Sequence, residues 1–165
     1  ETAFPFYLRS SLYRQYQDSL FNISDHNNVT LSVGVPDYLH RRNERFVYNT
    51  VFHFFPQNRN YNPYIKQKLV PVAEKIVYPA VFDLLGDLLP GLSGWTKGTE
   101  STVFTAENAV YSLKDQKASF LKRDSISFAT LVCIESTFPL LVSEFKNSGA
   151  DWINLITNDG WFYPH

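Results

Sequence analysis

The sequence contains no methionine and only one cysteine, Cys133, among its 165 residues. A single cysteine cannot form a disulfide within the chain, so the fold has to rely on its hydrophobic core. The four histidines are too scattered to show the spacing of metal ligands, and we expect no structural metal. Because the first residue is a glutamate, we expect the sequence to be a piece of a longer protein.

An excess of charge of one sign is missing as well, since 15 Lys and Arg stand against 16 Asp and Glu. The basic run HRRNER at 40–45 is short, so a nucleic acid partner is not expected. The most apolar stretch, 76–92, contains two prolines and two aspartates and falls short of the roughly 20 apolar residues that span a bilayer. Extended to residues 76–95, it suits either ordinary core or an apolar arm at a membrane surface.

The length and the hydrophobic fraction of 44% favour one compact α/β unit. Apolar residues at steps of four (Leu8, Leu12, Tyr16 and Leu20) predict a helix over 8–21. Aromatic and β-branched residues predict strands at 28–39 and 45–55. The other patterns predict a loop at 57–64, a helix around 79–89 and a short strand near 101–105.

The last forty residues have the clearest pattern. Residues 125–134 read as a strand, apolar positions from Phe138 to Phe145 have helical spacing, and Gly149 ends that helix. Residues 151–157 are nearly all apolar, as in a strand covered on both faces. This order predicts a βαβ unit with two parallel strands and a right-handed crossover.

Cys133 lies where the first of these strands ends. Ser136 or Thr137 is expected to cap the following helix, with Pro139 in its first turn. A thiol at the positive end of a helix and at the carboxyl edge of a sheet is placed for reactivity. Free cysteine is also a common core residue, so position alone leaves a nucleophile and a buried filler equally open.

Four motifs occur in order along the chain: ETAFP at 1–5, YIKQKLVPVAEKIVYP at 64–79, VCIES at 132–136 and GADWINLITNDGWF at 149–162. Together they resemble motifs of the apolipoprotein N-acyltransferases, a membrane branch of the nitrilase (carbon–nitrogen hydrolase) superfamily. The resemblance covers residues 1–162. It implies a nitrilase-like α-β-β-α sandwich, with residues 1–165 as an incomplete catalytic domain without its transmembrane part.

Matched residue by residue, the resemblance implies a catalytic triad of Glu1, Lys66 and Cys133, with Glu74 and Glu135 as supporting acids. The chemistry needs these types: a thiolate attacks a carbonyl, a carboxylate moves protons, and a cation stabilises the oxyanion. Taken alone, Lys66 and Glu74 would usually be solvated surface residues.

The implied reaction moves a fatty acyl chain from a phospholipid to Cys133 and then to the N-terminal amino group of an apolipoprotein. It implies the periplasmic side of a bacterial inner membrane and requires no cofactor. One alternative is a soluble nitrilase-type amidase with the same triad. Another is a non-catalytic lipid- or lipopeptide-binding module, favoured by the aromatic content of 16% and by Ile134 and Ala73, which depart from the motifs as Tyr163 does.

Overall fold

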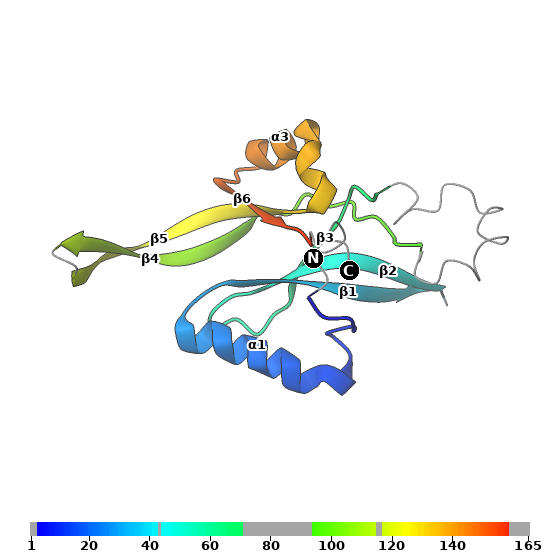
Figure 1. Ribbon diagram of the computed structural model, residues 1–165, viewed down its shortest axis with the longest axis horizontal. Coiled ribbons are helices and arrows are strands. Elements are labelled where there is room, and N and C mark those ends of the chain that lie inside the picture. The colour runs from blue at the N-terminus through cyan, green and yellow to red at the C-terminus, as the bar shows by residue number, and fades with distance from the viewer. Residues whose placement is uncertain (1–2, 43, 71–93, 115–116, 159–165) are drawn as a thin grey trace, which may run out of the picture.

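A computed structural model describes residues 3–42, 44–70, 94–114 and 117–158. Two sheets face each other, with α1 on the outer side of one sheet and α3 on the outer side of the other (Figure 1). The elements in chain order are η1 (Ser11–Tyr13), α1 (Arg14–Asn27), β1 (Leu31–Arg41), β2 (Glu44–Phe54), β3 (Asn62–Ile65), β4 (Phe104–Lys114), β5 (Lys117–Val132), η2 (Cys133–Thr137), α3 (Pro139–Asn147) and β6 (Trp152–Ile156). The predicted α-β-β-α order of layers is confirmed.

The first sheet has the order β1-β2-β3, and all its pairs are antiparallel. The predicted strands at 28–39 and 45–55 correspond to β1 and β2. Residues 62–64, predicted as loop, instead belong to β3, where Pro63 pairs with Phe52. An edge strand tolerates this proline because one side of its backbone needs no ladder hydrogen bond.

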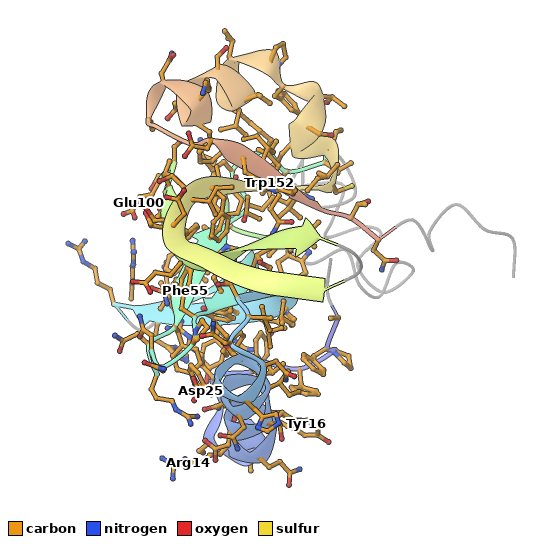
Figure 2. All side chains as sticks on the ribbon, turned by 90° about the vertical axis from the view of Figure 1, so that its left-hand side faces the viewer. Arg14, Tyr16, Asp25, Phe55, Glu100 and Trp152 are labelled. Carbon is orange, nitrogen blue, oxygen red and sulfur yellow. The ribbon has the colours of Figure 1, made fainter. Side chains whose placement is uncertain are left out.

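Helix α1 begins later than predicted and uses a different face. Leu12 is 81% exposed, whereas Phe21 and Ser24 are buried against the first sheet. Figure 2 shows Tyr16 on the outer surface of the helix. Two of the predicted residues do reach the core, since Leu8 is fully buried and Leu20 packs against the same cluster, but Leu8 precedes the helix, and Leu12 and Tyr16 are exposed. Steps of four residues drift by about 40° per repeat around a 3.6-residue turn, so they do not stay on one helix face.

The second sheet has the order β4-β5-β6, with β4 antiparallel and β6 parallel to β5. The predicted βαβ unit is confirmed as β5-α3-β6, and Gly149 follows the helix with a φ of 94°. The strand predicted near 101–105 is the start of the longer β4. The prediction that this last strand is covered on both faces is wrong within the described residues, since Trp152 is 60% exposed and Leu155 is 48% exposed.

The main core lies between the two sheets and α3. It consists of buried side chains from all three layers: Val51, Tyr64, Phe104, Phe128, Leu131, Leu141 and Phe145. The helix predicted around 79–89 lies outside the described residues. No helix in the described ranges is both long and apolar enough to cross a bilayer.

His53 joins the two sheets at the centre of this core. Its Nδ1 lies 2.9 Å from Ser32 Oγ and its Nε2 lies 3.1 Å from Thr130 Oγ1. The ring is fully buried, with its centroid 4.3 Å from that of Phe104. Burial lowers the pKa of His53 from 6.5 to about 3, so the imidazole stays neutral in the folded protein.

We predict that His53 makes the fold sensitive to acid. Between pH 6.5 and about 3 the unfolded chain binds a proton that folded His53 does not, so stability falls as the pH falls. The free energy advantage of the wild type over His53→Gln should shrink by about 1.4 kcal/mol for each pH unit in this window. Urea unfolding at several pH values measures it.

The exposed His26 supplies the control, because His26→Gln removes a histidine that the fold does not bury. The side chains that contact His53 are Ser32, Thr130 and aromatic rings, none of which titrates in this window. A constant gap between wild type and His53→Gln from pH 7 to 4 would contradict the prediction.

Candidate functional site

Cys133 sits on a sharp turn at the carboxyl end of β5. Its φ is 53°, in the left-handed region that non-glycine residues rarely adopt. Such backbone costs on the order of 1 kcal/mol and clusters at functional sites. The side chain is partly exposed and packs beside the main core, so Cys133 is not a fully buried filler.

The hydroxyls after Cys133 hold this turn instead of capping the next helix. Ser136 Oγ donates to the Cys133 carbonyl at 3.1 Å, and Thr137 Oγ1 donates to the Ile134 carbonyl at 2.8 Å. The N-cap of α3 is Phe138, so the predicted capping by Ser136 or Thr137 is wrong. Pro139 does lie in the first turn of α3, as predicted.

Glu135 is fully buried two residues after Cys133 and accepts four hydrogen bonds. Its Oε1 accepts from the backbone N–H groups of Gln67 and Lys68, at 2.6 and 3.0 Å. Its Oε2 accepts from the Tyr64 hydroxyl at 2.9 Å and from the Val132 N–H at 2.8 Å. One carboxylate therefore ties the end of β5 to the segment that follows β3, about 70 residues away in sequence.

Burial and hydrogen bonding act on the pKa of Glu135 in opposite directions. Burial raises the pKa of Glu135, and the hydrogen bonds from Lys68, Val132, Gln67 and Tyr64 lower it again in part. Burial, with the nearby Glu135 charge, raises the pKa of Tyr64 far above its usual value of 10. Tyr64 is thus a neutral donor, and all four partners of Glu135 donate.

Lys66 follows β3 and is 1% exposed, so a solvated surface position is wrong for this lysine. Its backbone is fixed on both sides: its N–H donates to the Asn49 carbonyl at 2.9 Å and its carbonyl accepts from the Gly98 N–H at 2.8 Å. The next residue, Gln67, anchors to residues 100 and 101 through its side-chain amide. Residues 64–68 are therefore held by β2, by the segment at 98–101 and by Glu135.

Gly98 allows the chain to pass close to this segment. A Cβ at position 98 would lie 2.3 Å from the Ile65 carbonyl oxygen, an impossible approach to backbone. We expect Gly98→Ala to lower the free energy of unfolding by about 1–3 kcal/mol because the two segments must separate. Urea unfolding measures this, with the exposed neighbour Lys97→Ala as control. Equal stability of both variants would contradict the prediction.

The structure thus brings the Lys66 segment and the Cys133 turn together through Glu135. Glu1 and Glu74 lie outside the described residues. Sequence reasoning did not single out Tyr64, Gln67 or Gly98. Tyr64 and Gln67 stand inside the YIKQ motif and could have been found there, whereas nothing around Gly98 in the sequence signals its contact.

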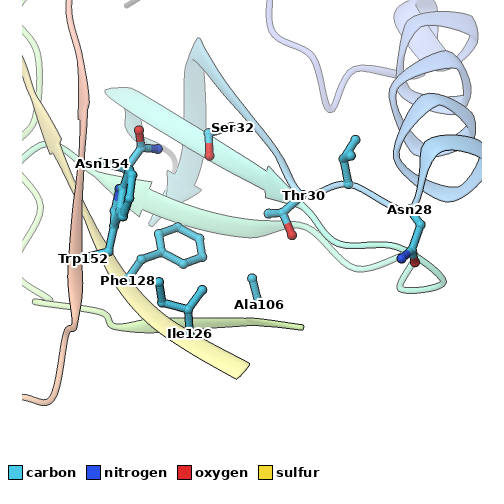
Figure 3. Close-up of a pocket in the computed structure, with 9 residues that line it drawn as sticks. Asn28, Thr30, Ser32, Ala106, Ile126, Phe128, Trp152 and Asn154 are labelled. Atoms are coloured by element: carbon cyan, nitrogen blue, oxygen red, sulfur yellow. The ribbon is translucent and has the colours of Figure 1, made fainter. Parts of the chain in front are cut away.

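A separate hollow of about 440 Å³ opens between the sheets at the start of β6 (Figure 3). Its apolar floor includes Phe128 and Ile126, and Thr30, Asn154 and Trp152 stand at its rim. Phe128 precedes Cys133 by five strand residues, a rise of roughly 16 Å. The hollow therefore lies apart from the cysteine turn.

Comparison of the sequence with known proteins finds acyltransferases that are similar to it. No family model matches the sequence. The apolipoprotein N-acyltransferase of Chlorobaculum tepidum is 32% identical over 98% of this chain and 31% of its own length. The chain is a homologue of the apolipoprotein N-acyltransferases. Apolipoprotein N-acyltransferase 2 of Treponema denticola is 28% identical over 88% of the chain and 25% of its own length.

Solved structures give the fold of this acyltransferase homologue. An N-terminal amidase with a Gln-Val peptide matches 86% of the chain and 31% of its own length, with a TM-score of 0.55 and 11% identity. The same amidase with an Asn-Glu-Ala peptide gives a TM-score of 0.54. These amidases have the nitrilase fold, so the chain has the architecture of a partial nitrilase-like domain. It spans less than a third of the length of the acyltransferases named above.

Proposed function

We propose that this chain carries the catalytic centre of an apolipoprotein N-acyltransferase, with Cys133 as nucleophile. The acyl donor is a phospholipid, and the acceptor is the α-amino group of the lipid-modified N-terminal cysteine of an apolipoprotein. The reaction takes place on the periplasmic side of a bacterial inner membrane. The names of the homologues support this proposal.

The first step forms a thioester. The Cys133 thiolate attacks the ester carbonyl of the phospholipid, the tetrahedral oxyanion collapses, and the lysophospholipid oxygen leaves with a proton. In the second step the acceptor amine attacks the thioester carbonyl, the thiolate leaves, and the amine loses a proton. Glu1 moves these protons and Lys66 stabilises both oxyanions, as the motif match implies. Glu74 and Glu135 support them.

The single observation that carries the proposal is the link made by Glu135. Two motifs that resemble those of the acyltransferases, around Lys66 and around Cys133, meet at one buried carboxylate. That carboxylate fixes the backbone of residues 67 and 68 on one side and of Val132 on the other. Because the left-handed turn at Cys133 directly follows Val132, the link positions the cysteine relative to the lysine segment.

Trapping the thioester tests the proposal. The full-length protein is incubated with phospholipid in the absence of acceptor and digested, and the mass of the peptide that contains Cys133 is measured by mass spectrometry. We expect a mass gain of one fatty acyl group that hydroxylamine removes, as it does from thioesters. Adding a lipopeptide with a free amino terminus should transfer the acyl group to that amine.

The same experiment separates the alternatives. A nitrilase-type amidase would form no acyl-enzyme from phospholipid and would release ammonia from small amides instead. A lipid- or lipopeptide-binding module would bind lipid and leave the mass of the Cys133 peptide unchanged. Either result would replace the proposed function.

A further inference from the structure

The β1–β2 hairpin concentrates positive charge on a chain whose net charge is −1. Arg41, Arg42 and Arg45 are exposed at its tip, and Glu44 is the acid among them. The salt bridges formed within the described ranges involve Arg9 with Asp37 and Arg59 with Asp25, so none of the three tip arginines is neutralised by an ion pair there. Asp37, the other acid on the hairpin, is buried and paired with Arg9.

Arg45 packs against two aromatic rings that meet edge to face, with their centroids 4.8 Å apart. Its guanidinium carbon lies 4.5 Å from the centroid of Tyr7 and 4.6 Å from that of Tyr38. These residues line a hollow of about 360 Å³ together with Ser10, Tyr13 and His40. Because Arg45 is exposed, the N–H donors of its guanidinium are accessible to a ligand, and arginine binds phosphate through such donors.

In Figure 1, β5 runs from the β4–β5 hairpin, at one end of the sandwich, towards the side on which the tip of the β1–β2 hairpin lies, and its carboxyl end leads into Cys133. Exposed Leu12 stands at the rim of the hollow, next to the tyrosines. Arginines beside aromatic and apolar side chains are the composition of protein surfaces that lie on a lipid headgroup layer.

We propose that Arg41, Arg42 and Arg45, with Tyr7 and Tyr38, form a surface that docks on anionic phospholipid headgroups, and that Arg45 takes one headgroup phosphate. The arginines supply charge complementary to an anionic bilayer, and the tyrosines hold Arg45 in place. Docking there orients the Cys133 end of the molecule towards the lipid surface. The choice of phospholipid as partner rests on the proposed acyl-transfer function.

Vesicle sedimentation with the 165-residue chain tests this surface. The chain carries Cys133→Ala, so that no acyl transfer takes place and binding is measured on its own. We expect it to partition onto phosphatidylcholine vesicles that contain phosphatidylglycerol and to bind pure phosphatidylcholine weakly. The double variant Arg41→Gln/Arg42→Asn should partition roughly 30-fold less, since each arginine contributes about 1 kcal/mol near an anionic surface. Asn at position 42 suits its left-handed φ of 48°.

A charge-matched control removes two cations elsewhere. Arg14→Gln/Lys146→Gln changes exposed residues of α1 and α3 and should alter partitioning by less than about threefold. Arg45→Gln should lose more binding than Arg45→Lys, which keeps the charge but not the planar fork. Thermal unfolding confirms that each variant is folded.

Equal binding to neutral and anionic vesicles, or equal losses in the hairpin and control variants, would overturn the proposal. Complete competition by millimolar glycerol phosphate would also overturn it, because the site would then recognise a free phosphate rather than a lipid surface. A chain that docks on vesicles while the full-length protein forms no acyl-enzyme would overturn the proposed function and leave the docking surface intact.

Discussion

Cys133→Ala in the full-length protein is expected to abolish acyl transfer, with a loss of at least about 10³-fold in turnover of phospholipid. Alanine has no group that can carry the acyl chain, so no thioester forms and the second step has no substrate. The measurement is transfer of a labelled acyl chain to a lipopeptide. The side chain at position 133 is partly exposed at the edge of the core, so the fold should survive the change.

Two further variants make this result interpretable. Cys133→Ser should lose nearly as much activity, because a serine hydroxyl stays protonated where a thiol can ionise. Lys146→Ala, at an exposed position near the end of α3, should transfer acyl chains at the wild-type rate. Activity above one tenth of wild type in Cys133→Ala would show that the cysteine is not the nucleophile.

Glu135→Ala is expected to be the most destabilising of the substitutions considered for this chain, lowering the free energy of unfolding by about 3–5 kcal/mol. It leaves three backbone N–H groups, of which that of Val132 is buried and those of Gln67 and Lys68 are partly buried, and the buried Tyr64 hydroxyl without their acceptor. Because these groups hold the lysine segment against the cysteine turn, acyl transfer by the full-length protein should fall as well. Urea unfolding of the chain measures the stability.

Glu135→Gln tests whether the carboxylate itself is required. Each oxygen of the Glu135 carboxylate accepts from at least one backbone N–H. In both orientations of the glutamine side-chain amide, its NH₂ group therefore faces a backbone N–H and cannot accept from it. We expect a loss of about 2 kcal/mol, whereas Tyr64→Phe, which removes one donor, should cost about 1 kcal/mol. The exposed carboxylate Glu144→Gln should be neutral. A Glu135→Gln variant as stable as Glu144→Gln would show that an amide satisfies the same donors.

The local sequence predicted most of the secondary structure, and the motif resemblance implied the order of layers. Strands β1 and β2 follow from their β-branched and aromatic residues, and β5-α3-β6 follows from the change of apolar period across Cys133 and from Gly149. The four motifs also indicated the acyltransferases to which the sequence is similar. These inferences succeed because they depend on residues that are close together in the chain.

The tertiary structure decided what depends on distant contacts. Period alone could not tell which face of α1 meets the sheet, nor that Pro63 lies in an edge strand. Sequence periodicity could not show that Glu135 accepts hydrogen bonds from residues 64–68, or that Gly98 packs closely against the backbone of Ile65. Burying a carboxylate or a histidine destabilises the fold unless hydrogen-bond partners surround the side chain. Those partners come from segments that are far apart in the sequence, so no short-range pattern can predict them.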